Sequence, residues 1–231
     1  MRLYDTKEEQ KVDITPNVAG TVDIYCCGPT VYRFAHVGNM RTFLLGDLVR
    51  RTLRAEGLRY RYIQNITDVG HLNDDVNIDS GGDSLEDKIL AQAKLEQKDP
   101  FEIARFYEEA FHDDLRALNI MPADAYPKAS ESISLITDLI AQLIYIGAAY
   151  QGSDGSLYFA VRSFKDYGAI SNNSLDQLRA GHRFDINNEE SGKRFHADWA
   201  LWKAAAANRQ MTWQTPWGVG FPGWHIECSA M

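Results

Sequence analysis

The chain has 231 residues, of which 45% are hydrophobic and 24% charged, and its formal net charge is −8. This composition is typical of a globular protein with one large or two small domains, and the negative charge argues against a broad electropositive surface for nucleic acid within this chain. No apolar run approaches the roughly 20 residues that span a bilayer, and the polar N-terminus lacks an apolar signal region. We therefore expect a cytoplasmic protein with no membrane partner.

The first part of the chain predicts a strand, a helix and a second strand. Residues 21–27 alternate apolar and polar side chains and are rich in β-forming residues. Residues 40–56 carry apolar side chains at helical spacing before Gly57, and residues 60–66 resemble another strand. The apolar residues of the predicted helix are Leu45, Leu48, Val49 and Leu53. A βαβ unit of this kind has parallel strands.

Ligands of such sheets bind beyond the carboxyl ends of the strands. Two segments follow those ends here, residues 27–39 and residues 67–75. We expect them to meet in space and to carry the functional site.

Later segments predict three further helices and a hairpin. The predicted helix starts are Ser84 with Asp87, Asp99 with Pro100, and Ser130, and the third of these helices ends at Gly147. The hairpin turns around residues 152–155. Residues 121–195 break the alternation of strands and helices and therefore resemble an insertion.

The segment before the first helix has the features of an anion site. His36 precedes Gly38 and Asn39 at the expected helix start, where unpaired N–H groups attract negative charge. Gly38 lets backbone approach an anion, Asn39 can cap the helix, and His36 can donate a hydrogen bond to a phosphate oxygen. The alternative interpretation is a well-capped helix with an incidental histidine.

The cysteines are Cys26, Cys27 and Cys228, an odd number with two of them adjacent, which argues against a disulfide framework. Cys26 is expected to face the core. Cys27 is either a buried thiol, which spacing alone favours because no C-x-x-C is present, or a zinc ligand near a helix start. Near the C-terminus, Trp224 and Cys228 are either wall and ligand of a site or a core tryptophan with a buried thiol.

Five stretches in this order resemble a known family. They are "YCCGPTVYRFAHVGNMRTFLLGDLVRRTLR", "NITDVGHL", "EDKI", "ALWK" and "PGWHIECSAM". Together they resemble the cysteinyl-tRNA synthetases, which are class I aminoacyl-tRNA synthetases. The resemblance implies an α/β, Rossmann-like catalytic fold with an incomplete parallel sheet. It further implies a first catalytic half over residues 1–120, a connective α+β insertion over 121–195, and a return to the catalytic domain over 196–231.

The resemblance also assigns site residues. Cys27 and Cys228 match two zinc ligands of the family, while the other two ligands lie in a downstream segment that this sequence does not contain. Residues 36–39 match the HIGH signature, which implies catalytic roles for His36 and Asn39 and ATP binding by His36, Gly38 and Asn39. The residues that match positions lining the cysteine pocket are Thr30, Thr67 and Trp224.

The activity implied by the resemblance is ATP-dependent activation of cysteine, with Mg²⁺ accompanying ATP, and transfer to tRNA(Cys) by a monomer in protein biosynthesis. The KMSKS signature is absent from this sequence. We therefore expect a truncated form or a natural half-length protein that is inactive alone, holds zinc weakly, and contacts tRNA mainly through missing regions. The alternatives are the cysteine ligase of mycothiol biosynthesis and a non-catalytic synthetase-like paralogue.

Overall fold

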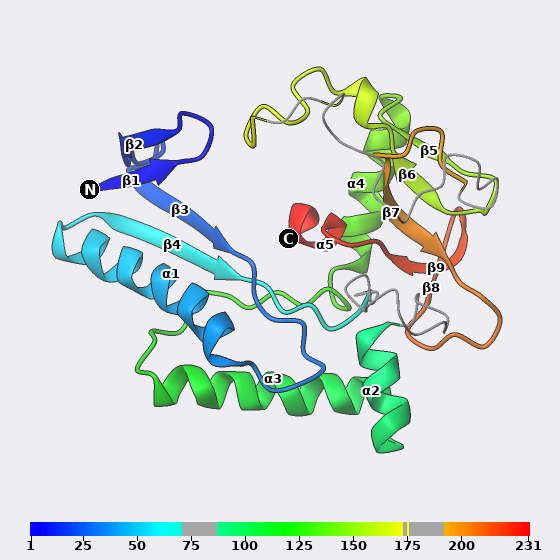
Figure 1. Ribbon diagram of the computed structural model, residues 1–231, viewed down its shortest axis with the longest axis horizontal. Coiled ribbons are helices and arrows are strands. Elements are labelled where there is room, and N and C mark those ends of the chain that lie inside the picture. Colours follow the sequence, from blue (N-terminus) through cyan, green and yellow to red (C-terminus); the bar gives the residue numbers. More distant parts are fainter. Residues whose placement is uncertain (71–86, 173–174, 176–191) are drawn as a thin grey trace. The chain divides into compact units, whose positions relative to one another are not determined.

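A computed structural model describes residues 1–70, 87–172, 175 and 192–231 (Figure 1). The chain divides into two compact units. Unit 1 consists of Asp13–Ser132 with Met1 and Met231, and unit 2 consists of Arg2–Val12 and Ile133–Ala230. Each unit is described by itself. None of the helices in the described ranges is both long and apolar enough to cross a membrane.

Unit 1 contains the predicted βαβ unit. Strand β3 (Thr21–Cys26) leads through helix α1 (Val37–Ala55) to strand β4 (Arg59–Gln64), and α1 packs along β4 (Figure 1). The two strands are parallel, in a register that runs from Thr21 opposite Arg59 to Cys26 opposite Gln64. The parallel pairing predicted from the sequence is confirmed.

A third segment extends this sheet on the side of β4 opposite β3. Residues 124–129 run beside β4 and its continuation, where Ile63 and Ile66 form parallel bridges with Ala125 and Lys128. The main-chain N–H of Gln64 donates to the carbonyl of Ala125 at 3.1 Å. Pro127 of this segment cannot donate to a strand ladder and therefore interrupts the pattern of a regular strand, so alternation in the sequence did not predict its extended conformation.

The buried face of α1 differs from the predicted one. Leu45 and Leu48 are 61% and 53% exposed, so two of the four residues assigned to the apolar face lie outside the core. The buried residues of the helix are Met40, Phe43, Asp47, Arg50 and Leu53. Leu53 is buried as predicted, but two charged residues also belong to the inner face, so apolar spacing alone identified that face only in part.

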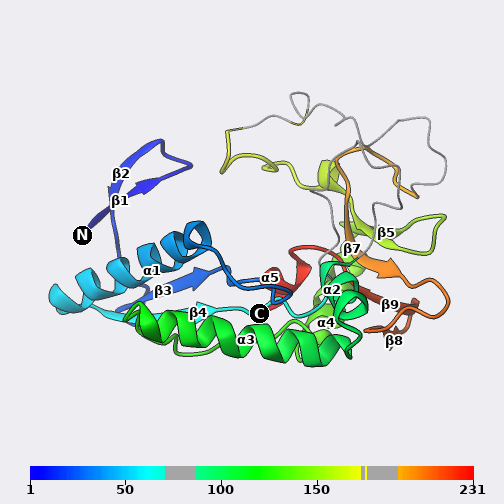
Figure 2. The same cartoon turned by 60° about the horizontal axis from the view of Figure 1, so that its bottom comes forward.

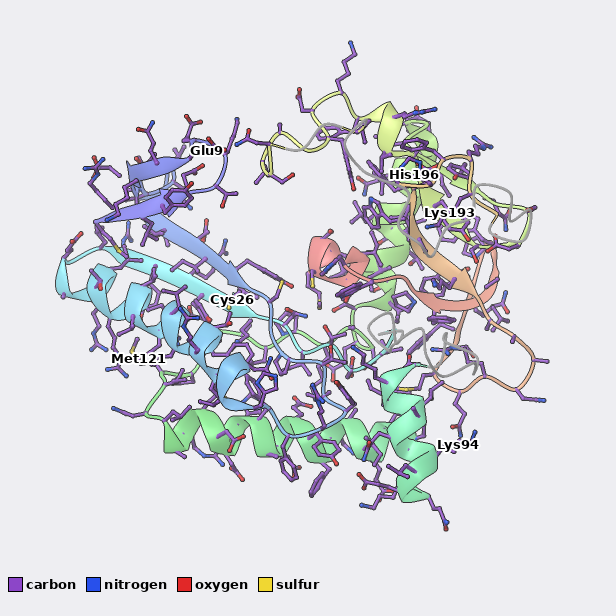
Figure 3. All side chains as sticks on the ribbon, viewed as in Figure 1. Glu9, Cys26, Lys94, Met121, Lys193 and His196 are labelled. Atoms are coloured by element: carbon purple, nitrogen blue, oxygen red, sulfur yellow. The ribbon has the colours of Figure 1, made fainter. Side chains whose placement is uncertain are left out.

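Asp47 and Arg50 are buried because they bond to each other and to the backbone. Asp47 Oδ1 accepts from Arg50 at 3.3 Å and from the main-chain N–H of Met121 at 2.9 Å. Arg50 donates to the carbonyls of Met121 and Pro122 and lies 4.0 Å above the centroid of the Tyr62 ring. Figure 3 labels Met121, which these bonds hold beside α1. The pair ties α1 to β4 and to the segment around Met121.

The ends of the unit 1 helices follow the predicted chemistry in part. Gly57 has φ +73° just past α1, where the N–H of Leu58 donates to the carbonyl of Leu53 at 2.9 Å, a Schellman end. Asp99 caps α3 (Pro100–Ala117) as predicted. Asp87, rather than Ser84, caps α2 (Lys88–Glu96), and Ser84 lies outside the described residues. Helices α2 and α3 contact each other (Figure 2).

Unit 2 holds helix α4 (Ile133–Tyr145) and an antiparallel sheet. The predicted hairpin is present as β5 (Ala149–Gln151) and β6 (Leu157–Phe159). After the short 3₁₀ helix η1 (Val161–Ser163), the sheet continues with β7 (Trp199–Ala204), β8 (Trp213–Thr215) and β9 (Gly218–Pro222) in the order β5-β6-β7-β9-β8. Helix α5 (Ile226–Ala230) packs on α4. Strands β1 (Arg2–Asp5) and β2 (Gln10–Asp13) pair separately.

The core of unit 2 lies between α4 and the sheet. Its buried members are Ile136, Ile140, Ala149, Leu157, Leu201, Trp202 and Ile226. Gly147 ends α4 with φ +75°, as predicted. Ser130 belongs to unit 1 and does not cap this helix, because its N–H and its hydroxyl both donate to the carboxylate of Asp68 in the same unit.

Candidate functional site

The loops that follow β3 and β4 meet, as the sequence predicts. Thr30 and Thr67 form a parallel bridge beyond the carboxyl ends of the two strands. The N–H of Val31 donates to the carbonyl of Thr67 at 3.2 Å, and the N–H of Thr67 donates to the carbonyl of Pro29 at 3.0 Å. Two of the three predicted pocket residues thus lie side by side at the edge where ligands of parallel sheets bind.

Gly28 lets the two loops approach closely. A Cβ atom at this position would lie 1.7 Å from the carbonyl oxygen of Asn65. The N–H of Gly28 donates to Asn65 Oδ1 at 2.9 Å. A side chain at residue 28 would force the loops apart, so glycine here is a structural requirement of the Thr30–Thr67 contact.

Helix α1 begins earlier than the sequence predicted, and its cap is a different residue. His36 is the N-cap, and its Nδ1 accepts from the N–H groups of Gly38 at 3.1 Å and Asn39 at 3.3 Å. Asn39, predicted to cap the helix, is its third residue, and its Oδ1 accepts from the N–H of His36 at 3.2 Å. The two side chains therefore form a reciprocal capping box.

This cap determines which nitrogen of His36 is available. Because Nδ1 accepts two hydrogen bonds, the neutral ring carries its proton on Nε2, which takes part in no hydrogen bond among the described residues. His36 is exposed. The helix start thus presents an imidazole N–H donor beside the positive end of the helix dipole, a combination suited to a phosphate oxygen.

The adjacent cysteines have different surroundings. Cys26, at the end of β3 (Figure 3), is half-buried, and burial raises the pKa of its thiol above the ordinary value. A hydrogen bond with Tyr62 partly offsets that rise. Cys27 is exposed. Of the two interpretations offered for Cys27, the structure removes the buried thiol, and its role as a metal ligand stays a prediction.

The C-terminal segment of unit 2 is held close to β7. The N–H of Gly223 donates to the carbonyl of Leu201 at 2.9 Å, and a Cβ atom at Gly223 would lie 1.9 Å from the carbonyl oxygen of Ala200. Trp224 follows and is 44% exposed, so it is not a core tryptophan. Its ring stacks on that of His225, with the ring centroids 4.6 Å apart.

Glu227 and Cys228 follow this tryptophan in the chain and lie on α5. Glu227 is buried, burial raises the pKa of its carboxyl to about 7, and its Oε2 has no hydrogen-bond partner within the ranges that the structure describes. Burial also lowers the pKa of His225. Cys228 is half-buried.

The described residues supply no complete set of zinc ligands. No group of three or more His, Cys, Asp or Glu side chains in the described parts of the chain is arranged to hold a metal ion, whereas structural zinc needs four such ligands. Cys27 belongs to unit 1 and Cys228 to unit 2. Their convergence on one metal ion stays a prediction, as does the contribution of Trp224 to the same pocket as Thr30 and Thr67.

Sequence reasoning missed one residue of this site, Asn65. It is 1% exposed and bonds to both loops, through Gly28 and through the hydroxyl of Thr67. Its place directly after β4 was the only signal available, because the partner of its side chain comes from a loop 37 residues earlier in the chain.

A parallel βαβ unit whose carboxyl edge leads into a histidine-capped helix start is the arrangement in which open α/β sheets bind their ligands. The family model described as "tRNA synthetases class I (C) catalytic domain" matches residues 13–231. The chain therefore belongs to the family of class I tRNA synthetase catalytic domains, and its fold is the Rossmann-like α/β fold that the sequence predicted, with an inserted α+β segment.

Similar curated proteins carry the name cysteine–tRNA ligase. The chain is 45% identical over 229 residues to the cysteine–tRNA ligase of Thermus thermophilus. The aligned region covers 99% of this chain and 46% of that protein. The corresponding protein of Deinococcus radiodurans is 46% identical over 99% of this chain and 44% of its own length. That of Chlorobium chlorochromatii is 43% identical over 100% of this chain and 46% of its own length. The chain thus spans about half the length of these relatives.

A solved structure of Mycobacterium tuberculosis methionyl-tRNA synthetase in complex with methionyl-adenylate also aligns with the chain. The TM-score is 0.46 and the identity 15%, over 60% of this chain and 26% of that one. The family assignment depends on the family model and the curated relatives, and not on this alignment.

Proposed function

We propose that this chain is the N-terminal catalytic portion of a cysteine–tRNA ligase, an enzyme that activates cysteine with ATP and transfers it to tRNA(Cys). The observation that carries the proposal is the edge of β3 and β4. There Thr30, on the loop that continues to the cap of α1, pairs with Thr67, on the loop that follows β4. Relatives named cysteine–tRNA ligase match almost the whole chain, which supports the same activity.

In the proposed reaction, a carboxylate oxygen of cysteine attacks the α-phosphorus of ATP in line, a new O–P bond forms, and pyrophosphate leaves with the electrons of the broken bond. Negative charge spreads over the phosphate oxygens in the transition state. The Nε2–H of His36 is the donor suited to that charge, and its ring is held in place by the bonds from Gly38 and Asn39. The positive end of α1 adds to this stabilisation.

Gly38 and Asn39 contribute to ATP binding indirectly in this proposal. Their N–H groups are bonded to Nδ1 of His36, so they orient the ring rather than meet the phosphate. A Cβ at residue 38 would lie 3.0 Å from the imidazole Cε1, so glycine leaves space for the ring to fold back over the helix start.

For the amino-acid substrate, we propose that Thr30, Thr67 and Trp224 line the pocket and that Cys27 and Cys228 are zinc ligands of the complete protein. The described residues supply no complete ligand set, and no step of the chemistry above depends on the metal. Mg²⁺ bound with ATP, a monomeric state, the domain boundaries at residues 120 and 195, and tRNA contacts outside this chain belong to the same proposal.

Cysteine-dependent exchange of pyrophosphate into ATP tests the activation step, measured on the complete protein encoded by the gene with zinc present. We expect exchange with cysteine and none with serine. Charging of tRNA(Cys) then tests the transfer step. Absence of exchange would contradict the proposal, whereas exchange without charging would redirect it to an amino-sugar acceptor.

The 231-residue chain alone is a separate test. We expect it to form no adenylate and to hold zinc in less than stoichiometric amount, because this sequence contains neither the KMSKS signature nor the two zinc ligands that the family has besides those matched by Cys27 and Cys228. Adenylate formation by the chain, or stoichiometric zinc that resists chelators, would show that other groups such as His225 or Glu227 serve in their place.

A further inference from the structure

Asn65 connects the two loops of the candidate site through its side-chain amide. Its Oδ1 accepts from the N–H of Gly28 at 2.9 Å, and its Nδ2 donates to Oγ1 of Thr67 at 3.1 Å. Because the main-chain N–H of Gly28 can only donate, the oxygen of the amide must face it, and the NH₂ group must face Thr67. The orientation of the amide is thus determined by its partners.

This orientation determines what the Thr67 hydroxyl can do. The NH₂ group of Asn65 can only donate, so Oγ1 of Thr67 accepts the bond and its own proton points elsewhere. Thr67 is 6% exposed, and its hydroxyl donates no hydrogen bond to any residue that the structure describes. Most buried hydroxyl donors in native proteins have partners. Within the ranges that the structure describes this one has none, which leaves it available to an acceptor on a bound molecule.

We propose that Asn65 is a positioning residue that makes the Thr67 hydroxyl a hydrogen-bond donor to an anionic oxygen of the substrate. The inference rests on the function proposed above. Two substrate groups have this chemistry, the carboxylate of the amino acid and the α-phosphate of ATP, since both are acceptors only. In either case Asn65 acts through Thr67 and does not itself touch the substrate.

The decisive variant is Asn65→Asp. An aspartate keeps the size of the side chain and still accepts from Gly28, but it has no donor for Thr67. The Thr67 hydroxyl then donates to the new carboxylate and is lost to the substrate. Because hydrogen bonds to charged groups are among the stronger ones, we expect kcat/KM for pyrophosphate exchange to fall about 10- to 100-fold.

Thr67 variants separate this effect from the added charge. Thr67→Val removes the hydroxyl at equal size and should produce a similar loss, whereas Thr67→Ser keeps the hydroxyl and should restore most of the activity. The double variant carries Asn65→Asp together with Thr67→Val. Because it has no Thr67 hydroxyl, the effect of Asn65→Asp on kcat/KM in this background reports the added charge alone. We expect the effect of Asn65→Asp to be at least fivefold smaller in that background, which a double-mutant cycle detects.

Binding of cysteine and of its alcohol analogue distinguishes the two substrate groups. The alcohol analogue of cysteine keeps the thiol and the amine but has no carboxylate. If the carboxylate is the acceptor, the variants weaken binding of cysteine and leave binding of the alcohol unchanged. If the α-phosphate is the acceptor, the KM for ATP rises and the ratio of the two cysteine ligands stays constant.

Asp124→Ala is the matched structural control. The Asp124 carboxylate accepts from the N–H of Tyr62, on the strand β4 that precedes Asn65, at 2.7 Å and has no bond to Thr67. It should lower the melting temperature and leave the KM values unchanged. If Asn65→Asp behaves in this way too, Asn65 is structural only and the inference is overturned. If the wild-type protein performs no exchange, the proposed function fails and the inference falls with it.

Discussion

His36 and Asn39 cap each other at the start of α1. Nδ1 of His36 lies 3.3 Å from the main-chain nitrogen of Asn39, and Oδ1 of Asn39 lies 3.2 Å from that of His36. The imidazole therefore uses one nitrogen for the fold and presents the other to the outside. The two roles belong to different atoms, so different substitutions should separate them.

His36→Asn should keep the cap and lose the donor, because asparagine is among the best N-cap residues but has no nitrogen at the position of Nε2. We expect the free energy of unfolding to stay within about 0.5 kcal/mol of wild type and kcat for pyrophosphate exchange to fall about 10²- to 10³-fold. His36→Ala should show the same catalytic loss and also lose about 1 kcal/mol of stability. Urea titration and exchange assays measure the two effects. Full exchange activity in His36→Asn would show that the Nε2–H of His36 makes no contact that contributes to catalysis.

Gly28→Ala should be far more damaging than a glycine substitution elsewhere in unit 1. The added methyl would lie 1.7 Å from the carbonyl oxygen of Asn65, which belongs to the backbone and cannot turn aside. We expect a loss of about 3 kcal/mol or more, together with loss of exchange as the loops separate. Urea denaturation measures the first effect.

Gly57→Ala provides the comparison for that variant. Gly57 has φ +73° but no atom within 4 Å of an added Cβ, so only the strain of a left-handed backbone counts. We expect a loss of about 1–2 kcal/mol with exchange activity retained. Equal effects of the two substitutions would mean that the contact of Gly28 with Asn65 is not close in solution.

The sequence was sufficient for the features that depend on neighbouring residues. Alternation in residues 21–27, the glycine at position 57 and the Asp99-Pro100 start each specify a local conformation, and all three are present in the structure. The inner face of α1 was not predictable in this way. One partner of the buried Asp47 carboxylate is the main-chain N–H of Met121, far along the chain, and no local pattern contains that information.

The same limit applies to the candidate site. The meeting of Thr30 with Thr67 followed from a general property of parallel strands, namely that their carboxyl ends share an edge. The roles of Asn65 and of the His36 ring required the direction of each hydrogen bond, which depends on side-chain placement. The convergence of Cys27 with Cys228 came from family resemblance alone and stays a prediction.

Asp47→Ala should be strongly destabilising. It removes the acceptor of Arg50 and of the Met121 N–H, and it leaves the Arg50 guanidinium, which is 2% exposed, without its carboxylate. Breaking one side of a buried ion pair costs about 3–5 kcal/mol. Because the same bonds hold α1 to the sheet, exchange activity should fall as well.

Asp113→Ala is the matched test of an ion pair at the surface. Asp113 pairs with Arg116 at the same i, i+3 spacing on α3, but the two side chains are 66% and 74% exposed. Its removal should change the free energy of unfolding by less than about 0.5 kcal/mol. A small effect at Asp47 as well would show that water reaches the Arg50 guanidinium.

Glu96 should make the packing of α2 on α3 dependent on pH. Its carboxylate accepts from Gln92 Nε2 at 2.7 Å, from Lys98 Nζ at 2.9 Å and from the hydroxyl of Tyr107 at 2.8 Å, and these donors lower its pKa from 4.5 to about 2. A carboxylate with a lowered pKa stabilises the fold above its unfolded pKa and loses that contribution as the pH falls. We expect wild type to be more stable than Glu96→Gln at pH 7, with the difference shrinking as the pH falls from about 4.5 toward 2.

Tyr107→Phe tests whether the donors cause this dependence. The substitution keeps the ring, which packs edge-on against Phe34 with centroids 5.2 Å apart, and removes only the hydroxyl that donates to Glu96. With one donor fewer, the pKa of Glu96 should lie closer to its ordinary value, and the loss of stability on acidification should become smaller. Urea midpoints of wild type and the two variants at pH 7, 4 and 3 measure this. An acid dependence that is the same in wild type and Glu96→Gln would assign it to other carboxylates.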